Sequence, residues 1–324
     1  MYLSPKRLRA GSKVAIVAPA STFSTEDLGA GVDLLREMGL EPVMGPCVKN
    51  LKTSIFNSAS VSARVEELNW AFSSPSISAV FCVRGGVGSA ALLPYLDYDV
   101  IKRSRKPFVG KSDITSLSMA ILEKSNLVTF NGRAASCRSD KGSIIFDSDC
   151  ESVRLTLQLL MSDKPWNSAP FSINSHFPRT VSPGRARGYA IGGNCDTFVH
   201  LLGTDYFPTT TPAILFLEDN SISSVELSRM LIHMRLAGVL DRVEGVVIGE
   251  FMNLPKKNGM GDDAATLEEV IIDHFGQGQP CAMGYSFSHG TYTSPIPMGA
   301  MCTLDADSGT VNFDFQMASP GVST

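Results

Sequence analysis

The chain has 324 residues, of which 44% are hydrophobic and 19% are charged, and its formal net charge is −4. This composition predicts a globular protein long enough for two domains, and the slight negative charge does not favour a nucleic-acid partner. No apolar run approaches the ~20 residues of a membrane-spanning helix, and the N-terminus lacks a secretory signal. Seven cysteines without a CxxC pair indicate free thiols. We therefore expect a cytoplasmic protein without a membrane partner.

Expected strands alternate with expected helices through the first half of the chain. A continuous apolar run predicts a buried strand, and apolar residues at helical spacing predict a helix. The expected elements follow one another at residues 13–19, 26–38, 41–44, 60–72 and 77–83. This alternation predicts a Rossmann-like α/β domain with a doubly wound parallel sheet, which we place at residues 1–161.

The second half begins after a segment with little apolar periodicity. Residues 162–187 are rich in Pro, Ser and Arg, and we interpret them as a linker. Residues 188–324 form the second predicted domain. Its expected elements are strands at 213–219 and 245–249, helices at 195–202, 224–237 and 265–274, and a terminal hairpin around 307–309.

The stretch from Lys106 to Lys124 reads as a strand that turns sharply into a helix. Ser112 stands at the turn, where the free N–H groups and the dipole of a helix N-terminus favour developing negative charge. This is the geometry of a nucleophile elbow. The alternative is that Ser112 only caps the helix, and on this stretch alone the cap is the better explanation.

A second turn, Arg84 to Ala90, is rich in glycine and directly follows a predicted strand. From Gly86 it matches G-x-G-x-x-A, but the rest of a dinucleotide-binding fingerprint is missing. Glycines also let backbone N–H groups approach a reacting carbonyl, as an oxyanion hole requires. A tight turn with positive φ angles is the structural alternative.

Two further residues are candidates for acid–base chemistry. Glu218 ends an apolar strand, where a carboxylate is costly unless it is paired or exposed, although it or Asp219 could instead cap the next helix. His289 lies in a loop, where a lone histidine is more often a surface residue. Ser112, Glu218 and His289 together supply a nucleophile, an orienting carboxylate and a general base. No histidine pair has metal-ligand spacing, so we expect no metal.

Four strings carry a resemblance to a known family: Val83–Ala90, Leu93–Asp99, Lys106–Thr115 and Leu215–Glu218. They are similar to strings of the LD-carboxypeptidase family, serine peptidases that include murein tetrapeptide carboxypeptidases and microcin C immunity peptidases. The resemblance runs through nearly the whole chain. It implies a Rossmann-like N-terminal domain joined to a smaller, β-rich α+β domain, a homodimer, and no cofactor.

The same resemblance assigns roles to residues. It makes Ser112 the nucleophile, has Glu218 and His289 complete the triad, and forms the oxyanion hole from the N–H groups of Gly86 and Asp113. We also expect two residues to bind the peptide substrate, namely Arg84 and Asn194. Three departures from the family pattern near the expected pocket bear on substrate identity: Lys111, Arg133 and Ser288.

The expected activity is hydrolysis of an L,D-peptide bond that releases D-Ala from murein tetrapeptide during peptidoglycan recycling. The alternative is a microcin C immunity-type peptidase that cleaves a peptidyl or aminoacyl nucleotide. The interval between Ser112 and Glu218 leaves little room for the substrate-covering loop of that branch, which favours the first activity. A nucleotide-binding module without hydrolase activity, using residues 86–91, is a third hypothesis.

Overall fold

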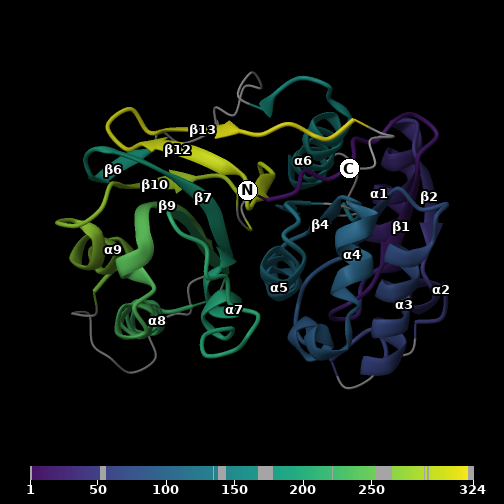
Figure 1. The fold of residues 1–324 in the computed structure, drawn as a ribbon, viewed down its shortest axis with the longest axis horizontal. Coiled ribbons are helices and arrows are strands. Elements are labelled where there is room, and N and C mark those ends of the chain that lie inside the picture. Colours follow the sequence, from purple (N-terminus) through teal and green to yellow (C-terminus); the bar gives the residue numbers. More distant parts are fainter. Residues whose placement is uncertain are drawn as a thin grey trace.

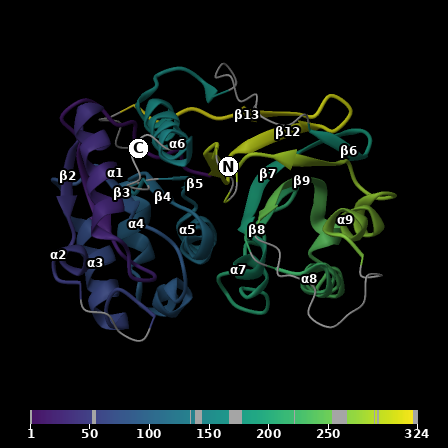
Figure 2. The same ribbon diagram turned by 180° about the vertical axis from the view of Figure 1, so that it is seen from behind.

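The computed structural model describes residues 2–51, 56–133, 135–137, 144–166, 178–220, 222–252, 265–287, 289 and 292–319. The chain forms two lobes, each built on a β-sheet (Figure 1). The N-terminal half, purple to blue, makes one lobe, and most of the C-terminal half, green to yellow, makes the other. Helices α5 and α7 face each other across the junction (Figures 1 and 2).

The first sheet is mostly parallel and is covered by helices on both faces. Within the described residues its strand order is β11-β5-β4-β3-β1-β2, and only β11 runs antiparallel to its neighbour. Its strands are β1 (Lys13–Val17), β2 (Glu41–Met44), β3 (Ala79–Cys82), β4 (Phe108–Gly110), β5 (Thr129–Asn131) and β11 (Ile296–Met298). Its helices are α1 (Thr25–Glu37), α2 (Pro46–Lys49), α3 (Val61–Ser73), α4 (Tyr98–Ser104), α5 (Thr115–Ser125) and α6 (Ile144–Met161), with 3-10 turns at Ser89–Tyr95 and Ser112–Ile114.

The second sheet is mixed. In the part of the chain that the structure describes, its order is β13-β12-β7-β8-β9-β10-β6, with β7 to β10 parallel to one another. Its strands are β6 (Arg179–Ser182), β7 (Arg185–Asn194), β8 (Ala213–Asn220), β9 (Val243–Met252), β10 (Cys281–Tyr285), β12 (Met301–Asp305) and β13 (Thr310–Asp314). Its helices are α7 (Cys195–Val199), α8 (Ser224–Leu236) and α9 (Leu267–Phe275), with a 3-10 turn at Leu240–Arg242.

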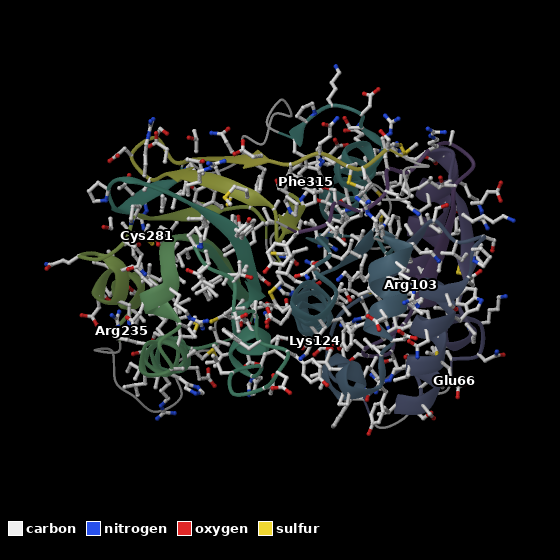
Figure 3. The ribbon with its side chains drawn as sticks, in the orientation of Figure 1. Glu66, Arg103, Lys124, Arg235, Cys281 and Phe315 are labelled. Atoms are coloured by element: carbon white, nitrogen blue, oxygen red, sulfur yellow. The ribbon has the colours of Figure 1, made fainter. Side chains whose placement is uncertain are left out.

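Apolar runs in the sequence become the buried strands of both sheets. Residues 14–17 of β1 and 213–217 of β8 are all fully buried, because helices cover the central parallel strands. The C-terminal segment joins the lobes through Phe315, which lies beyond β13 and is labelled in Figure 3. Its ring packs edge-on against those of Phe130 and Trp166. The Trp166 backbone N–H also donates to the Phe315 carbonyl at 2.7 Å.

The predicted fold class, a Rossmann-like sheet domain followed by a β-rich α+β domain, is confirmed. The strands do not follow the predicted domain ranges everywhere. The described part of the predicted linker contains β6 and the start of β7, and β11, from the predicted C-terminal domain, completes the first sheet. The polar stretch before residue 188 forms strands because its arginines lie on an exposed face, where Arg185 and Arg187 pair with Asp305 and Asp314.

No described helix is both long enough and apolar enough to cross a bilayer.

Candidate active site

Ser112 sits at a strained turn between β4 and α5. Lys111 is still extended, with φ −144° and ψ 177°, whereas Ser112 has φ +62°. For a residue with a Cβ atom, this left-handed conformation costs about 1–2 kcal/mol, and such strain persists mainly where the surroundings impose it. Neither the 3-10 turn nor α5 has a side-chain cap, so the prediction that Ser112 caps the helix is wrong. The turn is that of a nucleophile elbow.

The glycine-rich turn lies beside Ser112. Gly86 and Gly88 have φ angles of +119° and +100°, which glycine adopts without strain. The turn is tied to the residue after Ser112: the Ser89 N–H donates to Asp113 Oδ2 at 2.8 Å, and the Ser89 hydroxyl donates to the Asp113 carbonyl at 2.6 Å. Burial raises the pKa of the Asp113 carboxyl. The two predicted oxyanion-hole residues therefore belong to connected segments of backbone.

Glu218 has the partner that a carboxylate at the end of an apolar strand requires. Its side chain is 1% exposed, and its Oε2 lies 2.7 Å from Nδ1 of His289. His289 is itself largely buried. The alternative that Glu218 or Asp219 caps the following helix is wrong, because Ser223 caps α8 in a capping box with Glu226. The structure thus joins two of the three predicted catalytic side chains.

A cavity of about 580 Å³ opens where the strands of both sheets end. In α/β folds, ligands bind beyond the carboxyl ends of parallel strands. Ser112 and His289 both line this cavity, and so do the predicted oxyanion residue Gly86 and the predicted substrate-binding residues Arg84 and Asn194. Among the described residues, the Ser112 hydroxyl forms no hydrogen bond, including none to His289. In enzymes without bound substrate, catalytic hydrogen bonds are often long and close only in the complex.

The two predicted substrate-binding residues, Arg84 and Asn194, differ in exposure and in their hydrogen bonds to the rest of the protein. Arg84 is exposed at the cavity wall. Asn194 caps α7: its Oδ1 accepts from the backbone N–H of Thr197 at 3.1 Å and from the Thr197 hydroxyl at 2.8 Å. The side-chain Oδ1 of Asn194 therefore already accepts two hydrogen bonds from Thr197. Both roles stay predictions.

Two of the three departures from the family pattern line the cavity. Lys111 adjoins Ser112, and Arg133 forms an ion pair with Asp149 at 2.6 Å, with the Asp149 side chain 1% exposed. Ser288 lies outside the described residues. The Asp149 partner was not found from the sequence, since α6 is not among the predicted elements. No sequence motif near either residue indicates that Asp149, on α6, pairs with Arg133, which follows β5.

Asp219 is a second buried carboxylate at this wall. It is 3% exposed, and its Oδ2 and Oδ1 accept from the backbone N–H groups of Asp196 at 2.9 Å and Asn220 at 2.6 Å. Burial, and after it the neighbouring charge of Glu218, raises the pKa of Asp219 to about 6. Asp219 therefore holds α7 against β8, while Glu218 holds the histidine. The described residues contain no cluster of three His, Cys, Asp or Glu side chains that could bind a metal ion.

Comparison with known proteins places the chain in a family. The family profile described as the LD-carboxypeptidase N-terminal domain matches residues 14–132, and the profile of the C-terminal domain matches residues 187–304. The chain belongs to the LD-carboxypeptidase family. The resemblance that the sequence motifs carry is thereby confirmed for both halves.

Several relatives match nearly the whole chain. A Streptomyces coelicolor protein with carboxypeptidase in its name, SCO6489, is 32% identical over 98% of this chain and 98% of its own length. The murein tetrapeptide carboxypeptidase of Pseudomonas aeruginosa is 26% identical, covering 91% and 94%. The microcin C7 self-immunity protein MccF of Escherichia coli is 27% identical, covering 93% and 92%. The fold is that of MccF: its structure in complex with glutamyl sulfamoyl guanosine matches with a TM-score of 0.83 at 24% identity, over 98% of this chain and all of that one.

Proposed function

We propose that this LD-carboxypeptidase is a serine peptidase that hydrolyses an L,D-peptide bond and releases D-Ala from murein tetrapeptide, as in peptidoglycan recycling. The observation that supports it most is the Glu218–His289 hydrogen bond at the wall of the cavity that Ser112 also lines. A peptide as substrate, a homodimer and a cytoplasmic location belong to the same proposal.

The geometry supports a triad mechanism. With its Nδ1–H donated to Glu218, the His289 ring has Nε2 available to accept the proton of the Ser112 hydroxyl. Ser112 Oγ then bonds to the carbonyl carbon of the scissile peptide, and the N–H groups of Gly86 and Asp113 stabilise the oxyanion. When the C–N bond breaks, His289 returns the proton to the leaving amine. Water, activated by the same histidine, hydrolyses the acyl-enzyme and regenerates Ser112.

A carboxypeptidase must recognise the free carboxylate next to the bond that it cleaves. Arg84 offers an exposed guanidinium at the cavity wall, directly before the predicted oxyanion turn. A guanidinium binds a carboxylate through two parallel hydrogen bonds. Arg84 therefore supports exopeptidase action, and Asn194, whose amide lies at the same wall, is the second candidate contact.

The alternative is a microcin C immunity-type peptidase that cleaves a peptidyl or aminoacyl nucleotide. It is favoured by the likeness to MccF, which matches this chain about as closely as the murein tetrapeptide carboxypeptidase does. A cavity of about 580 Å³ lies within the range of small-ligand sites and suits either substrate.

Incubation of the purified protein with murein tetrapeptide tests the proposal. We expect mass spectrometry to show the tripeptide and free D-Ala, and the Ser112→Ala variant to show neither. A parallel reaction with a peptidyl adenylate analogue that retains a cleavable amide tests the alternative, which is correct if only this compound is cleaved. Nucleotide binding by calorimetry without hydrolysis of either compound would support the non-catalytic module instead.

A further inference from the structure

The glycine-rich turn beside Ser112 is held by side chains that come from outside the cavity wall. The Val87 N–H donates to Oγ of Ser21 at 3.0 Å. The Val87 carbonyl accepts from Nδ2 of Asn57 at 2.7 Å, and the Gly88 carbonyl accepts from Nη1 of Arg64 at 3.0 Å. The shape of this turn therefore depends on three polar side chains distant from it in sequence.

Arg64 is the centre of this arrangement. Its side chain, on α3, is 1% exposed, and it also donates from Nη1 to the Pro19 carbonyl at 2.7 Å and from Nη2 to Asn57 Oδ1 at 3.2 Å. Within the described residues it forms no ion pair with a carboxylate. Burial makes the charge of this cation costly, and the neighbouring charge of Asp113 favours it. Its Nη1 and Nη2 groups donate to two backbone carbonyls and to Asn57. Arg64 and Asn57 thus act as one clamp, which we call the Arg64–Asn57 clamp.

The other end of the turn is bonded to the nucleophile segment. Ser89, the residue after Gly88, donates two hydrogen bonds to Asp113, the residue after Ser112. The clamp on one side and the Ser89–Asp113 pair on the other leave the backbone between them little freedom. Both proposed oxyanion donors, the N–H groups of Gly86 and Asp113, lie in this connected unit.

We infer that Arg64 and Asn57 are positioning residues that hold the Gly86 N–H in place for the oxyanion. The inference rests on the proposed function, because it assumes that Ser112 is the nucleophile. Oxyanion donors accelerate a reaction only when they are already oriented as charge develops. Loosening the clamp should therefore slow the chemical step, while the nucleophile, the His289–Glu218 pair and substrate binding stay as they are.

A fluorophosphonate probe tests the inference without a known substrate. The Ser112 oxygen bonds to phosphorus as its proton passes to His289, and fluoride leaves. The phosphoryl oxygen needs the same donors as a tetrahedral intermediate. We expect Asn57→Ala and Arg64→Lys to slow the labelling of Ser112 by about 10-fold, which is less than the loss on removing an oxyanion donor outright. With murein tetrapeptide, kcat should fall by a similar factor and KM should change little. Lysine at residue 64 keeps the charge but not the planar fork that reaches three acceptors.

The matched control is Ser60→Ala. Ser60 caps α3, the helix that carries Arg64, and its hydroxyl accepts from the Ala63 N–H at 3.3 Å without contacting the turn. Loss of this cap should lower the melting temperature and leave the labelling rate unchanged. Asn57 is only half-buried, so its variant should fold even if Arg64→Lys does not.

The outcomes separate the two claims. If wild-type protein is labelled at Ser112 and the folded Asn57→Ala variant is labelled equally fast, the clamp has no positioning role and the inference is wrong. A wild-type protein that is not labelled at Ser112 overturns the serine mechanism and the inference together. Equal slowing in Ser60→Ala would mean that loss of stability alone explains the effect, and this too overturns the inference.

Discussion

Gly85 packs directly against Ser112, so closely that a Cβ atom on Gly85 would lie 2.8 Å from Cβ of Ser112. The same atom would lie 2.7 Å from the Lys111 carbonyl oxygen and 3.0 Å from the Asp113 nitrogen. Two of these three neighbouring atoms belong to the backbone and the third is a Cβ atom, so none of them can move aside by rotation of a side chain. The glycine-rich turn can therefore approach Ser112, the proposed nucleophile, only if residue 85 has no side chain.

Replacement of this glycine tests the close approach. We expect Gly85→Ala to push the turn away from Ser112 and to lower kcat by about 100-fold, comparable to the loss of an oxyanion donor. The control is Gly29→Ala, in α1, where a Cβ atom meets nothing within 4 Å. That change should raise the free energy of unfolding by about 0.5–1 kcal/mol and leave kcat unchanged. Full activity in Gly85→Ala would show that the turn does not need this contact.

Ser112 combines a proposed chemical role with backbone strain, and two substitutions separate the two. Ser112→Ala and Ser112→Gly both remove the hydroxyl, so both should lower kcat by about 10⁶-fold. Only glycine relieves the positive φ angle, and we expect Ser112→Gly to be more stable than Ser112→Ala by about 1 kcal/mol. Urea denaturation of the two variants measures this difference. Equal stabilities would argue against strain at the nucleophile.

The assignment of the orienting carboxylate rests on which acid contacts His289. Glu218→Gln keeps the shape of the side chain but removes the charge that fixes the histidine tautomer, so kcat should fall by about 10⁴-fold. Asp219→Asn should cost far less activity, because Asp219 bonds to backbone N–H groups and not to the histidine. The reverse ranking, measured as kcat of the two folded variants, would make Asp219 the orienting residue.

Asp219 should also give the stability a dependence on pH. Its pKa of about 6 in the folded protein lies above the ordinary value of about 4, so the folded state holds this proton more tightly than the unfolded chain does. The free energy of unfolding should therefore fall as pH rises from about 4 to about 6, by at most about 3 kcal/mol from this group. Asp219→Asn should remove that part of the decline. If wild type and variant show parallel curves in urea denaturation across this range, the carboxyl does not titrate as stated.

The parts of the site that could be predicted are those that local sequence encodes. The turn at Ser112 and the glycine turn at Gly86 each follow a buried strand within a few residues, so apolar runs and glycines are enough to find them. The Glu218–His289 bond spans 71 residues, and spacing alone could suggest the two residue types but not their contact. The same holds for Arg64, whose position within a helix gives no sign that its guanidinium reaches the glycine turn.

The fold shows the same division. Long strands such as β1 and β8 were predictable because they are buried on both faces and therefore apolar throughout. β11 is three residues long and contains a proline. A segment this short is not long enough to show the alternation of apolar and polar residues that predicts a strand. It joins the first sheet because it can pair with β5, a partner far away in sequence. Short edge strands of this kind are specified by the surface that they complete.

Arg84 gives the sharpest test of carboxylate recognition. Its guanidinium is exposed at the cavity wall, so Arg84→Gln should leave the fold intact while removing the proposed contact with the substrate carboxylate. A charged hydrogen bond contributes about 1.5–3 kcal/mol, so kcat/KM for murein tetrapeptide should fall by about 10- to 100-fold. The same peptide with an amidated C-terminus should show little further loss in the variant, because it cannot use the contact.

The control for charge is Arg103→Gln. Arg103 is an exposed residue of α4, labelled in Figure 3, and it is not among the residues that line the cavity. It lowers the net charge by the same amount, so a long-range electrostatic effect would reduce kcat/KM in both variants and would weaken with added salt. A contact effect reduces it in Arg84→Gln alone and depends on the free carboxylate. If Arg84→Gln hydrolyses the free and the amidated peptide with the same ratio as wild type does, the carboxylate is bound elsewhere in the cavity.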